Sequence, residues 1–283
     1  MKKSNSASGL TALAVLQRSV LTALAVILAL PIYSWDYDAT ASTTETVIQA
    51  RVGANFTKKW YCGVRLSLSE ELRFNLDQIV IASNAKSLDA NSNKSYTTLT
   101  VAYAHPEFPY LKIDGGYTLR MLFNKGWSDP NEYLRHRAFF GLTGSYRIRY
   151  FKLSMRERFV CDMRTDSVNL LEKNRYNWLL RSRIGGEYTV PGKPVKPYLW
   201  AELENTLNLP EYQQKDGRQL ISHVRAQAGV KWRITKLSSL DFFYRYQYGY
   251  NRDINITKGK GYIQLTEQKT HLHALGVAYN LDW

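Results

Sequence analysis

The chain has 283 residues, a formal net charge of +14 and a mean hydropathy of −0.37. That average is too polar for a bundle of transmembrane helices, whereas 20 tyrosines and an aromatic content of 13% are unusual for a soluble protein. The basic residues are spread singly and form neither a patch nor a tail, so the positive charge does not indicate a nucleic-acid partner.

The N-terminal segment has the three parts of a secretory signal peptide. Lys2, Lys3 and Arg18 precede the apolar run VLTALAVILALPIY (20–33), and the small residues ATAS follow at 39–42. A membrane anchor is the alternative, but the run is shorter than the ~20 residues that a spanning helix needs. We therefore expect 1–35 to be an export signal, with cleavage between 34 and 41, and 36–283 to form a single domain.

The remainder of the chain alternates apolar and polar residues in segments of strand length, and this period of two is the signature of β-strands. Eleven segments show it: 46–56, 61–75, 96–104, 110–124, 135–147, 151–164, 176–190, 198–207, 220–234, 240–251 and 270–282.

The connections between these segments alternate between short and long. The short ones are 57–60, 105–110, the residues around Arg149, 191–197 and 236–239, and the long ones are 76–95, 125–134, 165–175, 208–219 and 252–269. A soluble β-sandwich gives no reason for this alternation. It is typical of an antiparallel up-and-down transmembrane β-barrel, with short periplasmic turns and longer extracellular loops. The expected fold is therefore all-β.

The two faces of each segment differ in the way that a membrane barrel requires. In 220–234 one face carries Val224, Val230 and Trp232, while the other carries Arg225 and Lys231. A barrel turns the apolar face to lipid and the charged face to its lumen. In the last segment the apolar face includes Tyr279, Leu281 and Trp283, which resemble the C-terminal aromatic signal read by the barrel-assembly machinery.

Several stretches together resemble a known group, the uncharacterised small outer-membrane barrel proteins that are classed as a domain of unknown function. They are LSLSEELRFN (66–75), GLTGSYRI (141–148), FKLSMRERF (151–159), RSRIGGEY (181–188), PYLWAELENTLN (197–208) and FFYRYQYGYN (242–251). The resemblance implies a barrel in the outer membrane of a Gram-negative bacterium, in contact with lipid and lipopolysaccharide. It supplies no activity and no catalytic residues.

The number of strands is open between ten and twelve. Bacterial barrels of this kind have even counts. Either the first segment lies inside the lumen, which leaves ten strands, or a short strand within 33–40 brings the total to twelve. We expect twelve.

The lumen face is dense in charge. The candidate network consists of Arg65, Glu71, Arg73, Arg137, Arg156, Arg158, Arg181, Arg183, Glu187, Glu202, Glu204, Arg225, Arg233, Asp241 and Arg245. One interpretation is structural, because arginine–carboxylate ladders can fill and stiffen a narrow interior. The other is a pore or ligand pocket that attracts small anionic solutes, because arginines outnumber the acids. No metal or cofactor is expected.

Within this network the sequence predicts one specific neighbourhood. Antiparallel pairing through the 191–197 turn should bring Glu202 and Glu204 within reach of Arg183 or Arg181. The strength of these pairs would depend on whether the lumen is plugged or filled with water.

Two carboxylates break the alternation. Glu70 and Glu157 fall on the apolar parity of their segments, and we expect β-bulges that turn them inward toward Arg73, Arg156 or Arg158. Cys62 and Cys161 share the apolar parity but should lie at different heights, so we expect two free thiols facing lipid.

A hydrolase is the remaining class of function. None of His105, His136, His223, His271 and His273 is followed by a serine two residues on, the spacing at which base and nucleophile share one face of a strand. The stretch THLH (270–273) could supply a metal pair, but a solvated rim accounts for it as well. The sequence therefore favours three roles in turn: a barrel with an anion-attracting lumen, a plugged structural barrel that meets partners through its loops, and, with least support, an outer-membrane hydrolase.

Overall fold

The computed structural model describes residues 41–60, 62–82, 93–123, 134–164, 175–209, 221–256 and 263–283. These residues form eleven β-strands: β1 (Ala41–Lys59), β2 (Val64–Ala82), β3 (Lys94–Ala104), β4 (Leu111–Leu122), β5 (Leu134–Ile148), β6 (Phe151–Arg164), β7 (Tyr176–Tyr188), β8 (Val195–Thr206), β9 (Ile221–Arg233), β10 (Ser238–Ile256) and β11 (Ile263–Asp282). Within this described part, no helix is long and apolar enough to cross a membrane. The expected signal peptide and the 33–40 segment lie outside it.

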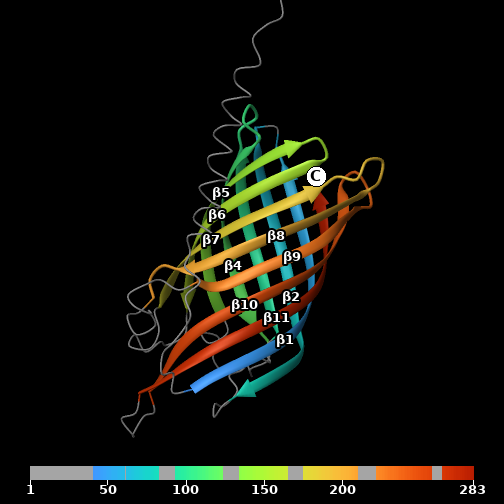
Figure 1. Ribbon diagram of the computed structural model, residues 1–283. Coiled ribbons are helices and arrows are strands. Elements are labelled where there is room, and N and C mark those ends of the chain that lie inside the picture. Colours follow the sequence, from blue (N-terminus) through green and yellow to red (C-terminus); the bar gives the residue numbers. More distant parts are fainter. Residues whose placement is uncertain are drawn as a thin grey trace, which may run out of the picture. The chain divides into compact units, whose positions relative to one another are not determined.

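The strands close into a barrel in which each strand pairs with its neighbour in sequence (Figure 1). All neighbouring pairs are antiparallel except the closing one, because β1 and β11 run parallel, with Ala50 opposite Leu275. An odd number of strands in up-and-down order forces this, since the first and last strands then point the same way. The all-β barrel is confirmed, but the expected even number is wrong for the described residues, which form eleven strands.

Four strands, β1, β2, β10 and β11, are longer than the sequence pattern predicted by four residues or more. Pairing between β10 and β11 continues to Ile256 opposite Ile263, so the connection expected over 252–269 is limited to 257–262. β1 and β2 likewise continue to Thr43 opposite Ala82. Main-chain hydrogen bonds can extend a hairpin past the last apolar residue, which is why the apolar pattern alone placed these ends too early.

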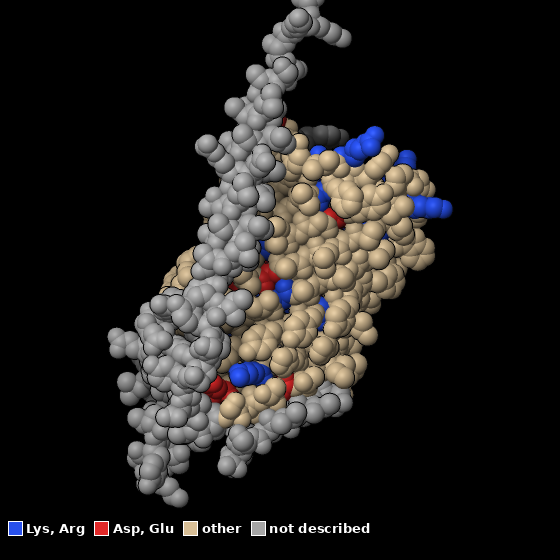
Figure 2. All heavy atoms as spheres, in the orientation of Figure 1, with Lys and Arg blue, Asp and Glu red and all other residues tan. Residues whose placement is uncertain are grey.

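Side chains separate cleanly between the two faces of the wall. Leu199 and Leu275 are 62% and 68% exposed on the outer face, whereas Val160 is fully buried on the interior face. In Figure 2 the outer wall in view is largely uncharged. Exposed basic residues such as Lys59, Arg149 and Lys193 lie at the short turns. The candidate functional residues must therefore be sought inside.

Candidate functional site

Two glutamates of β8 organise the centre of the interior. Glu202 accepts hydrogen bonds from Arg156 Nη2 (2.9 Å), Arg183 Nε (2.8 Å) and Arg225 Nη1 (2.9 Å). Glu204 accepts from Arg181 Nε (2.5 Å) and from the same Arg225 Nη1 (2.9 Å). Both glutamates are 3% exposed, so these charges are held almost entirely out of water. The pairing predicted through the 191–197 turn is confirmed, with Arg183 opposite Glu202 and Arg181 opposite Glu204.

A second set of ion pairs lies on β4, β5 and β6. Arg158 Nη2 donates to Asp114 Oδ1 over 2.9 Å, and Arg137 Nη2 donates to Asp162 Oδ2 over 2.7 Å. Asp114 is 2% exposed. Its parity and that of Asp162 match those of the arginines on their strands, so the alternation places Asp114 on the lumen face, and the same signal could have identified Asp162, which was missed.

Arginines also stack on aromatic rings inside the barrel. The guanidinium carbon of Arg183 lies 3.8 Å from the ring centroid of Trp200, and that of Arg245 lies 5.3 Å from it. Arg158 lies 4.1 Å from the ring of Phe139. Such contacts stabilise a cation when few waters are present. Trp200 shares the interior parity of Glu202 and Glu204, so the alternation placed it inside, but the stacking of arginines on it was not predicted.

At β1 and β2 the network is centred on Arg51. Its Nε donates to Gln49 Oε1 (2.7 Å) and its Nη1 to Glu71 Oε1 (3.4 Å). Arg73 also donates to Glu71 and lies over the ring of Tyr96, 3.7 Å from its centroid. Arg51 is 2% exposed, and its Nη2 has no hydrogen-bond partner.

These side chains surround an interior cavity of about 750 Å³. Its lining reaches from the long-connection end, where Arg135 and Arg164 lie, down to Arg156, Arg183 and Trp200. Interior residues nearer the short turns, such as Glu187 and Asp241, are not part of the lining. On the short-turn side of the cavity, Asp114, Gln227 and Phe243 are 2%, 5% and 9% exposed, and we call these three buried side chains the packed layer.

Four of the predicted network residues lie toward the short turns instead. Arg65 and Arg233 are exposed there and do not line the cavity, so their place in the network stays a prediction. Glu187 pairs with Lys231 Nζ (2.7 Å), and Asp241 accepts a hydrogen bond from Tyr198 Oη (2.9 Å).

The bulges expected at Glu70 and Glu157 are absent, because both residues sit in uninterrupted register, opposite Thr97 and Ser182 respectively. The carboxylates stay on the outer face and accept from hydroxyl groups of the next strand: Glu70 from Ser95 Oγ and from Thr97 Oγ1 (2.5 Å), and Glu157 from Ser182 Oγ (2.6 Å). A hydroxyl group on the neighbouring strand gives each carboxylate a hydrogen-bond donor, so no bulge is needed to turn it toward an arginine.

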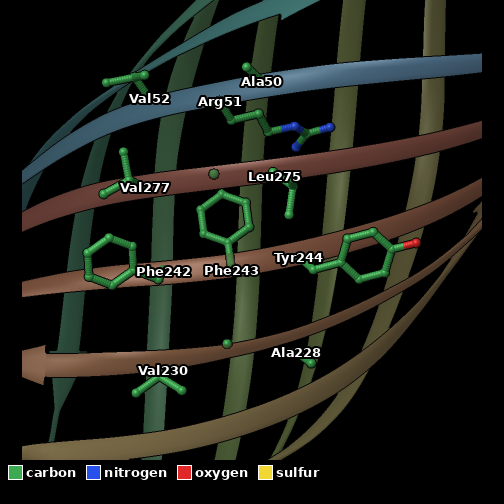
Figure 3. Close-up of a pocket in the computed structure, with 12 residues that line it drawn as sticks. Ala50, Arg51, Val52, Ala228, Val230, Phe242, Phe243, Tyr244, Leu275 and Val277 are labelled. Carbon is green, nitrogen blue, oxygen red and sulfur yellow. The ribbon is translucent and has the colours of Figure 1, made fainter.

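The wall itself is hollowed where β1, β9, β10 and β11 meet, in a cavity of about 570 Å³. Figure 3 shows Ala50 and Val52 on either side of Arg51, and Phe242 and Tyr244 on either side of Phe243. Neighbours along a strand point to opposite faces. The apolar neighbours thus form the outer side of this hollow, while Arg51 and Phe243 belong to the interior.

The histidines and cysteines do not gather at one place. His271 and His273 lie on the outer face, where Tyr246 Oη and Tyr244 Oη lie 2.9 Å and 2.7 Å from their Nδ1 atoms. His223 is interior, beside Glu204. Both cysteines are free. Across the described ranges, no three His, Cys, Asp or Glu residues are placed to hold a metal.

The C-terminal residues lie where the sequence placed them. Tyr279 and Trp283 are 37% and 47% exposed on the outer face, and Leu281 shares their parity. Trp283 is also tied to β1, since its amide donates to the Thr57 carbonyl (2.9 Å) and its carbonyl accepts from the Lys59 amide (3.0 Å).

Comparison with known proteins gives one solved structure to report, a chain titled "NanC porin structure in rhombohedral crystal form". It has 10% sequence identity and a TM-score of 0.41, over 70% of this chain and 86% of that one. No curated protein matches the chain. A family model matches residues 52–257. Because that match spans most of the chain, the protein belongs to the family described as "Protein of unknown function (DUF2490)".

Proposed function

We propose that the protein is an outer-membrane β-barrel that binds a small anion in a cavity entered from its long-connection end, and that it does not conduct solutes from one side to the other. The observation that carries this proposal is the position of the arginine-lined cavity, which ends at the packed layer of Asp114, Gln227 and Phe243. A channel requires a continuous hydrated path.

The outer face supports placement in a membrane. It is apolar along the strands, and Trp178, Trp232 and Trp283 are exposed near strand ends, where indole rings favour the lipid interface. With the expected export signal, this favours the outer membrane of a Gram-negative bacterium. The partners that follow are lipid, lipopolysaccharide and, through Tyr279, Leu281 and Trp283, the barrel-assembly machinery.

The balance of charge around the cavity supports an anion. Among the described residues, the cationic lining is Arg51, Arg73, Lys94, Arg120, Arg135, Arg137, Arg156, Arg158, Arg164, Arg181, Arg183, Arg225 and Arg245. The acidic lining is Glu45, Asp162, Glu202 and Glu204. An interior of one predominant sign in a low-dielectric wall concentrates counter-ions.

Planar-bilayer recording and calorimetry test the two halves of this proposal. We expect no stable conductance from the purified protein, and saturable heat when inorganic phosphate is added to it in detergent. Replacing Phe243 and Gln227 together with alanine should open the packed layer and give conductance. That conductance would also show that the barrel inserts into the bilayer, so that silence of the unaltered protein is not a failure of insertion. Conductance of the unaltered protein would contradict the proposal.

A plugged structural barrel is the second candidate. Glu202 and Glu204 each receive hydrogen bonds from at least two arginines, which is what a purely structural network requires. This role predicts silence in the bilayer and no anion binding, with partners engaged through the long connections.

A further inference from the structure

Three arginines stand side by side across three strands at the long-connection end of the cavity. Arg120 on β4 lies directly opposite Arg135 on β5, and Arg135 lies directly opposite Arg164 on β6. Tyr96 on β3 continues the line, opposite Arg120. We call Arg120, Arg135 and Arg164 the arginine row. All three line the cavity.

Two members of the row differ from most of the arginines deeper in the interior. Arg137, Arg156, Arg158, Arg181, Arg183 and Arg225 each pair with a carboxylate. Within the described ranges, no carboxylate forms an ion pair with Arg120 or Arg164. Their Nε atoms are buried and have no hydrogen-bond partner, which is also true of Arg137, Arg156 and Arg158, so the missing carboxylate is what distinguishes them.

Direct juxtaposition of like charges is unfavourable. Directly opposed residues on neighbouring strands have Cβ atoms about 4.5–5.5 Å apart, and like charges at that spacing repel. The repulsion is stronger in a partly desolvated cavity than at an open surface. A bound anion beside the three guanidinium groups would offset it.

The spacing and number of donors favour a tetrahedral dianion. Adjacent guanidinium groups about one strand spacing apart can bond to different oxygens of one phosphate group. A monocarboxylate has two oxygens and is already well served by one bidentate arginine. Phosphate offers at least three acceptor oxygens and up to two negative charges, so it can bridge neighbouring members of the row.

We propose that the arginine row binds a phosphate group, either free phosphate or a phosphate ester, in the outer part of the cavity. This inference rests on the proposed anion-binding function and adds the chemical class of the ligand and its position. The deeper Glu202 and Glu204 network then holds the wall in register and takes no part in ligand contact.

Calorimetric titration of the folded protein in detergent tests the site, with inorganic phosphate, glucose 6-phosphate and glucose as probes. Arg120→Gln and Arg164→Gln should each weaken phosphate binding about tenfold or more, because each removes a charge-assisted donor. Arg65→Gln and Arg233→Gln remove an exposed arginine at the short-turn end and should leave binding within about twofold of the unaltered protein. Tighter binding of the sugar phosphate than of phosphate would identify an ester as the ligand, and equal binding a free phosphate.

A second measurement covers variants that fold poorly. Phosphate should raise the urea midpoint of the unaltered protein, because a ligand stabilises the state that binds it. Phosphate should raise the urea midpoint of Arg164→Lys less, because lysine keeps the positive charge but lacks the planar guanidinium that donates two parallel hydrogen bonds. If phosphate binds equally to Arg120→Gln, Arg164→Gln and the unaltered protein, the row is not the site and the cavity function survives. If phosphate binds to none of them, the row and the proposed function both fail.

Discussion

Glu202 and Arg225 face each other across β8 and β9, and Arg225 Nη1 donates to Glu202 Oε1 over 2.9 Å. The glutamate also receives bonds from Arg156 and Arg183, so a single carboxylate joins β6, β7, β8 and β9. Its removal would leave three guanidinium groups close together in a nearly dry interior.

We therefore expect Glu202→Ala to lower the free energy of unfolding by roughly 3–5 kcal/mol, the usual cost of leaving buried charges uncompensated. Urea titration in detergent or liposomes measures this. Glu187→Ala is the matched control, because that glutamate pairs with lysines whose side chains are about 40% exposed, and it should cost no more than ~1 kcal/mol. Equal small losses in both variants would mean that the interior is filled with water.

Glu157 and Ser182 provide a test on the outer wall. Ser182→Ala leaves the carboxylate without its hydroxyl donor, and we expect a loss of about 1 kcal/mol. Glu157→Leu removes the polar group from an apolar surface and should be neutral or stabilising by up to ~2 kcal/mol in liposomes. Combining the two substitutions should abolish the penalty of Ser182→Ala. A penalty that persists in the double variant would argue that Ser182 acts independently of Glu157.

Gly116 marks a position where a side chain has no room. A Cβ there would lie 2.6 Å from Cζ of Phe139, which packs across it inside the barrel. We expect Gly116→Ala to destabilise the barrel by about 1–3 kcal/mol through overpacking. Gly144→Ala on β5 serves as the control, since a Cβ at that position would have nothing within 4 Å, and it should be neutral or slightly stabilising. The comparison needs only urea midpoints of the two variants.

Substitution of Trp283 tests assembly in cells separately from stability in vitro. Its main-chain bonds to Thr57 and Lys59 do not depend on the side chain, so Trp283→Ala should keep the strand closed and cost no more than ~1–2 kcal/mol in vitro. The same substitution should sharply reduce the amount of folded barrel in cells, as measured by heat-modifiable mobility on gels. Normal assembly in cells would show that the C-terminal aromatic residue is not read as a signal.

The middle of the sheet was predictable from sequence because its alternation is strong. The segments expected at 135–147 and 151–164 match β5 and β6 within one residue at each end. The pairs of Arg181 with Glu204 and Arg183 with Glu202 followed from one short turn, since antiparallel register is set once the turn is placed.

Contacts between non-adjacent strands could not be predicted in the same way. Arg156 reaches Glu202 across the whole of β7, and Arg158 reaches Asp114 across β5. Such contacts depend on the curvature of the closed wall and on side-chain length, neither of which the alternation encodes. Glu70 and Glu157 were misjudged for a related reason, because their hydroxyl partners become visible only when the neighbouring strand is set in register.

The junction between β1 and β11 differs from every other strand pair of the described barrel, because it is parallel. It joins segments far apart along the chain, as in the contact of Asn55 with Asn280, which are 225 positions apart. No hairpin can nucleate it, and its closure carries the largest loop entropy in the molecule. Parallel pairing is also slightly weaker per residue than antiparallel pairing. The barrel should therefore close between β1 and β11 last during insertion and open there first in denaturant. Amide hydrogen exchange should be fastest along these two strands.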